Sequence, residues 1–143
     1  MSRELDIFRD TYTQGKPFVR AKIGIVNPEN SRQTTIETVF WIDTGFDGGV
    51  HIPRAFELDA TGVGVTLLNG TIVVAGGRIE STHRCFAYLL QIGDFELPAP
   101  GLEAEIVFQG TNNYGLIGLD ILKNWTIKFD GLNQFFKISR LSS

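Results

Sequence analysis

The sequence predicts an all-β domain with one short helix near its C-terminal end. Sixteen glycines separate short runs rich in Val, Ile, Thr and Phe, which is typical of strands joined by tight turns. Residues 18–25 alternate apolar and polar side chains, the pattern of a half-buried strand. Only residues 119–125 resemble a helix, with Asp120 placed in its first turn. At 143 residues the chain fits one domain, residues 1–143.

The other elements follow in order along the chain. Residues 34–43 form a second strand that ends in an apolar run, and a helical turn is expected near residues 55–58. Residues 71–74 and 78–82 flank Ala75-Gly76-Gly77, the spacing of a β-hairpin whose tip needs positive φ. Further strands are expected at the following ranges: 85–92, 103–108, 125–129 and 135–138.

Composition excludes several classes of function. Thirteen Lys and Arg against 16 Asp and Glu give a net charge of −3, which argues against binding to nucleic acid. No apolar run approaches the roughly 20 residues that span a bilayer. The first residues lack the order of a signal peptide, so a cytoplasmic protein without membrane contact is expected. Cys85 is the only cysteine, which excludes an internal disulfide.

Asp43, Thr44 and Gly45 are the residues most suited to chemistry. A carboxylate directly after an apolar strand is partly desolvated, so its pKa is easily shifted. Gly45 allows a sharp turn, and the Thr44 hydroxyl can join two such loops. Taken by itself, an Asp-x-Gly sequence after a strand also fits an ordinary turn.

Asp43-Thr44-Gly45 resembles the active-site triplet of retropepsin-like aspartic proteases. Residues 74–78 resemble the flap hairpin of that family, and residues 116–122 resemble its apolar-apolar-Gly segment leading into a short helix. The resemblance covers roughly residues 18–140. It is closest to small soluble bacterial and archaeal members whose triplet continues Phe-x-Gly, as residues 46–48 do here.

The resemblance implies a closed β-barrel with the active site at a twofold dimer axis. It implies an aspartic endopeptidase that needs no cofactor and cuts extended peptides. Asp43 is then catalytic, Thr44 bonds across the axis and Gly45 shapes the loop. The implied substrate-binding residues are Phe46, Asp47, Gly48, Ala75, Gly76 and Gly77. Gly118 is expected to permit close backbone packing, and residues 135–138 to add a strand to a dimer sheet.

The chemistry needs two carboxylates that share one proton, one acting as base and one as acid. Aspartic proteases are the established example of this pairing. No second Asp-Thr/Ser-Gly triplet exists in this chain. Asp47 lies on the same loop, and Asp130 suits the turn of the last hairpin. The second carboxylate is therefore expected from Asp43 of a symmetry mate, which makes a homodimer obligatory.

Three features depart from the family pattern, and one of them is the flap, where Ala75-Gly76-Gly77 lacks the acidic or aromatic residues of some relatives. Phe46 stands in place of a small Ala, which reshapes the substrate groove, and Leu119 stands where an Arg often braces the dimer. Two alternative functions stay open. One is a catalytically weak or inactive peptide-binding module on the same dimeric fold, and the other is a small-ligand β-barrel in which Asp43 is a loop acid.

The remaining reactive side chains favour structural roles. His51 and His83 lack the neighbouring acids or cysteines of a metal motif, so no metal site is expected. Cys85 begins an apolar strand and is interpreted as a small buried hydrophobe.

Overall fold

The computed structural model of the chain describes residues 3–73, 76–110 and 113–142. Within them the strands are β1 (Arg3–Thr11), β2 (Phe18–Val26), β3 (Gln33–Ile42), β4 (Val50–Ile52), β5 (Leu68–Val73), β6 (Ile79–Ile92), β7 (Phe95–Glu96), β8 (Leu102–Phe108), β9 (Gly115–Ile117), β10 (Thr126–Asp130) and β11 (Phe135–Ser142). The helical segments are a 3-10 turn (Arg54–Phe56), α1 (Glu57–Gly62) and α2 (Leu119–Leu122).

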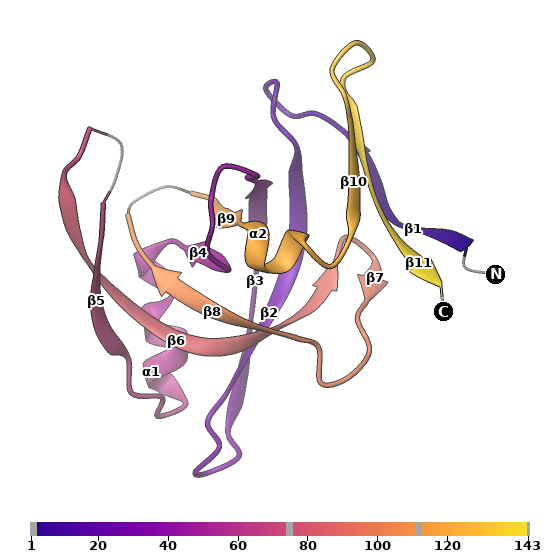
Figure 1. Ribbon diagram of the computed structural model, residues 1–143. Coiled ribbons are helices and arrows are strands. Elements are labelled where there is room, and N and C mark those ends of the chain that lie inside the picture. Colours follow the sequence, from indigo (N-terminus) through magenta and orange to yellow (C-terminus); the bar gives the residue numbers. More distant parts are fainter. Residues whose placement is uncertain (1–2, 74–75, 111–112, 143) are drawn as a thin grey trace.

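Six strands close into a barrel in the order β2-β3-β9-β4-β8-β6, because β6 pairs back with β2. Most neighbours are antiparallel, but β3 runs parallel to β9 and β4 parallel to β8. β5 pairs with β6 beyond the barrel, and the two strands form the long hairpin at the left of Figure 1. The prediction of an all-β barrel with few helices is confirmed.

A separate three-stranded sheet, in the order β1-β11-β10, lies beside the barrel and carries both chain ends (Figure 1). β11 has β1 on one side and β10 on the other, so both of its edges are paired within the chain. Residues 135–138 thus form a central strand within the chain, and their part in a dimer sheet stays a prediction. The neighbour on one edge is β1, the strand over residues 3–11 that the sequence pattern did not predict.

One apolar core fills the barrel and the space under the three-stranded sheet. Its largest fully buried side chains are Phe40 from β3, Phe108 from β8 and Phe136 from β11. In β2 the residues at alternate positions from Val19 to Ile25 are buried, which confirms the predicted alternation.

Several predicted elements change their length. The expected strands 78–82 and 85–92 form one strand, β6, because polar residues between them pair with β5 on one side and β8 on the other. The expected helix 119–125 is shorter, since α2 ends at Leu122. The helical turn near residues 55–58 is longer than expected and continues through α1 to Gly62. In the part of the chain described, no helix has the length and apolar character needed to cross a membrane.

Phe136 belongs to the core shared by the barrel and the three-stranded sheet, and its ring packs against Phe8 of β1 and against Tyr12, which follows β1. We expect Phe136→Ala to lower the free energy of unfolding by about 3–5 kcal/mol, because it removes a fully buried ring and leaves a cavity. Leu132→Ala is the control, since Leu132 is 93% exposed, and its effect should stay below about 0.5 kcal/mol. Chemical denaturation measures both, and equal effects would show that the sheet does not contribute to the core.

Candidate active site

Asp43 directly follows β3 and is half-buried. Its backbone N–H donates to the carbonyl of Ile117 at 2.9 Å, which extends the pairing of β3 with β9. Its carboxylate Oδ1 accepts a hydrogen bond of 2.9 Å from the Gly45 N–H. The side chain is thus oriented by its own loop, and the turn suggested by the Asp-x-Gly sequence is present.

The chain after β9 crosses the Asp43 loop at van der Waals contact. The Gly118 N–H donates to the carbonyl of Gly49 at 2.8 Å, and the Leu119 N–H donates to the carbonyl of Phe46 at 2.8 Å. A Cβ on Gly118 would overlap the carbonyl oxygen of Gly48 and lie 2.6 Å from that of Phe46. Only glycine fits, which confirms the close packing predicted for Gly118.

Phe46 packs onto its own loop. Its ring lies 4.2 Å from the His51 ring, centroid to centroid, and a Cβ on Gly48 would come within 2.7 Å of it. Phe46 therefore covers Gly48 and His51. Its predicted contact with substrate stays a prediction.

His51, on β4, is the site residue that sequence reasoning treated as unremarkable. Burial lowers its pKa from the ordinary value of 6.5, and the negative charge of Asp43 acts in the opposite direction. The His51 ring also packs on Phe46 of the Asp43 loop, so it lies against that loop. The positions of Phe46 and His51 in the chain gave no such signal, since only the folding of the loop between β3 and β4 brings their rings together.

The outer part of the loop faces solvent. Thr44, Gly45 and Asp47 are exposed, and Gly48 is half-buried. Within the described residues the Thr44 hydroxyl makes no hydrogen bond. These side chains and the adjacent backbone are accessible to a second molecule.

The predicted hairpin forms with β5 and β6 in register from Leu68–Arg84 to Val73–Ile79. Gly76 and Gly77 have φ of 90° and 78°, the positive values expected for its tip. Ala75 lies outside the described residues. In Figure 1 the hairpin tip stands apart from the loop between β3 and β4.

The base of this hairpin is tied to α1 and the turn before it. The Arg54 Nη2 donates to the Ser81 carbonyl at 2.8 Å, and His83 Nδ1 lies 2.9 Å from Glu57 Oε1. Beside these contacts is a cavity of about 880 Å³, lined in part by Arg54, Phe56 and Ser81. Sequence reasoning missed this cluster because the contacts between its two segments, residues 54–57 and 81–83, join residues 26 and 27 positions apart.

Two other candidate side chains have structural roles. Asp130 accepts hydrogen bonds from the backbone and side-chain amide of Asn133, which lower the pKa of its carboxyl group and confirm it as a turn residue. Burial raises the pKa of Cys85 to about 11, so its thiol stays protonated and it is the buried hydrophobe that was predicted.

The described ranges contain no group of three or more His, Cys, Asp and Glu side chains arranged to hold a metal ion. In comparisons with known proteins, no family model matches this chain, and neither a curated protein nor a solved structure matches it.

Gly118→Ala should lower the free energy of unfolding by about 1–3 kcal/mol, because its methyl group would have to displace the loop backbone. Gly131→Ala is the matched control, since a Cβ there meets nothing within 4 Å. Thermal or chemical unfolding compares the two. A Gly118→Ala protein as stable as the control would contradict the close packing of Gly118 on the Asp43 loop.

The pKa of His51 should fall below 6.5 in the folded protein, and Asp43→Asn should lower it further by removing the favourable charge. The ring protons of the two histidines, followed by NMR against pH, measure this directly, with His83 as the internal control. A His51 pKa that does not respond to Asp43→Asn would show that the Asp43 charge does not act on His51.

The same shift predicts a pH dependence of stability. The unfolded chain binds the His51 proton more readily than the folded chain does, so stability decreases as pH falls from about 6.5 through the folded pKa. His51→Phe should remove this contribution. Denaturation midpoints at several pH values, wild type against His51→Phe, test it.

Proposed function

We propose that the protein is an aspartic endopeptidase of the retropepsin-like class, active as a homodimer. The observation that carries the proposal is the placement of Asp43. Its carboxylate ends a barrel strand, is oriented by the Gly45 N–H at 2.9 Å, and rests on a loop locked by Gly118. A carboxylate held in this way is suited to positioning a water.

In the proposed reaction, the Asp43 carboxylates of two copies share one proton. The ionised carboxylate takes a proton from a water, whose oxygen attacks the peptide carbonyl carbon, and the protonated one gives its proton to the carbonyl oxygen. In the second step the carboxyl that took the water proton gives it to the amine nitrogen, the other carboxylate takes a hydroxyl proton from the tetrahedral intermediate, and the C–N bond breaks to leave a carboxylic acid and an amine. Neither the attack of water nor the cleavage of the C–N bond needs a cofactor.

Two features support a second copy as the source of the other carboxylate. Thr44 and Gly45 are exposed beside Asp43, so an identical loop can approach them. Asp130, an alternative partner in the same chain, is already engaged by Asn133. A twofold axis would bring like carboxylates together.

The hairpin supports an extended peptide as the substrate. β5 is the last strand of its sheet, and the tip beyond it contains two glycines with positive φ. Such a hairpin can close over a bound strand and exclude water. The cavity at its base offers space for a substrate side chain.

Asp43→Asn should reduce peptide cleavage by about a hundredfold or more, because the amide cannot serve as general base or share the proton. Digestion of an unstructured peptide mixture between about pH 3 and 7, analysed by mass spectrometry, measures the loss. The control is Asp94→Asn, which makes the same charge change in an exposed turn and should leave cleavage unchanged.

Protein concentration provides an independent criterion. If the dimer is obligatory, the rate in dilute solution should rise faster than linearly with protein concentration. Cleavage that survives Asp43→Asn would refute the proposed chemistry. A folded dimer that binds peptides but never cuts them would instead establish the peptide-binding module.

A further inference from the structure

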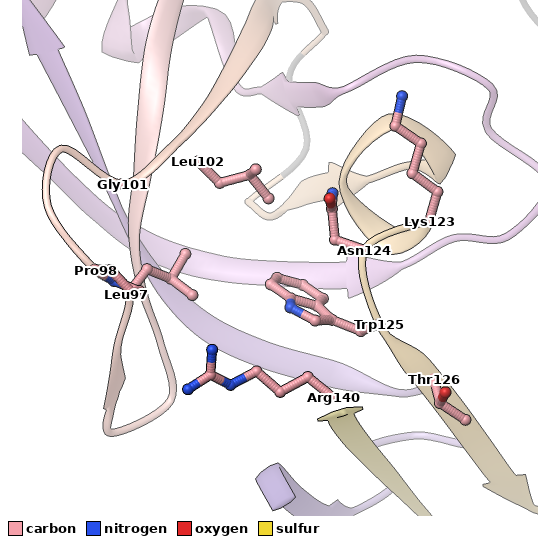
Figure 2. Close-up of a pocket in the computed structure, with 9 residues that line it drawn as sticks. All are labelled: Leu97, Pro98, Gly101, Leu102, Lys123, Asn124, Trp125, Thr126 and Arg140. Atoms are coloured by element: carbon pink, nitrogen blue, oxygen red, sulfur yellow. The ribbon is translucent and has the colours of Figure 1, made fainter. Parts of the chain in front are cut away.

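A second cavity lies between the barrel and the three-stranded sheet, lined by residues other than those of the Asp43 loop. It has a volume of about 580 Å³, within the range of small-molecule sites. Figure 2 shows side chains from three places around it: the segment between β7 and β8, the chain from α2 into β10, and β11. Residues distant in sequence thus converge on one space.

Positive charge distinguishes this cavity in an acidic protein. Its lining includes Arg140 and Lys123 and no Asp or Glu among the described residues. Neither cation takes part in any ion pair found in the described part of the chain. A site with this charge attracts an anion.

Arg140 carries a specific unsatisfied group. Its Nε is buried and has no hydrogen-bond partner within the described ranges. A buried donor without a partner is costly, and a guanidinium presents its N–H groups in a planar fork that fits an oxyanion. Because Arg140 lines the cavity, an oxyanion there can pair with the accessible part of this guanidinium fork.

The guanidinium is held in place before any ligand arrives. Arg140 follows Phe136 and Ile138 at alternate positions of β11, so the three side chains share the face that packs on the barrel. The guanidinium carbon lies 5.4 Å from the centre of the Phe95 ring, a cation–π contact. This prior placement reduces the entropy lost on binding.

The remaining lining combines apolar and aromatic side chains with the polar Asn124 and Thr126. The half-buried indole of Trp125 lies next to the Arg140 side chain in Figure 2, and Leu97 and Leu102 face it across the cavity. Lys123 stands at the rim with its ammonium group directed outward (Figure 2). The cavity therefore combines a fixed cation, a flat indole and aliphatic side chains.

We propose that this cavity is a binding site for a small organic anion with a planar apolar body. The acid group, a carboxylate or a phosphate, pairs with the Arg140 guanidinium, and the planar body lies against Trp125. Lys123 adds attraction from the rim. The site is separate from the chemistry assigned to Asp43 and does not depend on it.

The test uses three probes with one ring system, 2-naphthoate, 2-naphthyl phosphate and the uncharged 2-naphthamide. Each is titrated into the ¹⁵N-labelled full chain near pH 7, where both acids are ionised. The Arg140 Nε–H and Trp125 indole signals should shift and saturate with at least one acid. Trp41→Phe identifies the Trp125 signal, because the chain has two tryptophans. The acids then show which oxyanion the site prefers.

Arg140→Gln should weaken binding of the preferred acid about tenfold or more, as expected for loss of a charge-assisted hydrogen bond. Lys128→Gln removes the same charge from an exposed position of β10 and should leave affinity within about twofold. The unchanged remainder of each spectrum verifies folding.

Three results would overturn the proposal. One is the absence of a saturable shift with either acid up to about 10 mM, weaker than any specific site of this kind. Another is equal affinity for the amide and the acids, which needs no variant to observe. The last is equal weakening by Arg140→Gln and Lys128→Gln, which would mean that Arg140 only stacks on Phe95.

Discussion

The candidate site depends on one close approach, the passage of Gly118 across the carbonyl oxygens of Gly48 and Phe46. Because no side chain separates the two segments, three backbone hydrogen bonds can form between them. These bonds fix the loop that follows β3. The strand just before Gly118, β9, runs parallel to β3. The direction of the Asp43 carboxylate is thus set by backbone packing and needs no other side chain.

Around this fixed loop the fold is supported unevenly. The barrel strands have neighbours on both sides, whereas β5 has a neighbour only in β6. The hairpin is anchored at its base by Arg54 and the His83–Glu57 contact, and its tip contains glycines. A carboxylate held in one orientation and a hairpin anchored at one end suit a site that must admit an extended peptide and then close over it. Local stability is expected to be lowest where packing is least.

The sequence predicted those features that depend on a residue and its near neighbours in the chain. Alternation predicted β2, the glycine pair predicted a hairpin tip, and Gly118 predicted close packing. β1 was not predicted because nearly all of its side chains are exposed, which leaves no alternation to detect. The packing of His51 on Phe46, and the convergence of Arg140 and Trp125 on one cavity, could not be predicted, since tertiary folding alone brings these groups together.

The pairing of β1 with β11 also has a consequence for how the chain reaches its fold. β1 is synthesised before every other described strand and pairs with β11, which follows all of them, and the hydrogen bond between Glu4 and Ser139 spans 135 positions. Until β11 emerges, the edge of β1 has no partner and the apolar face beneath the sheet is uncovered. Contacts of such long range form slowly and leave nascent chains open to association. The six barrel strands all precede β11 in the chain, so the barrel can assemble before the three-stranded sheet forms.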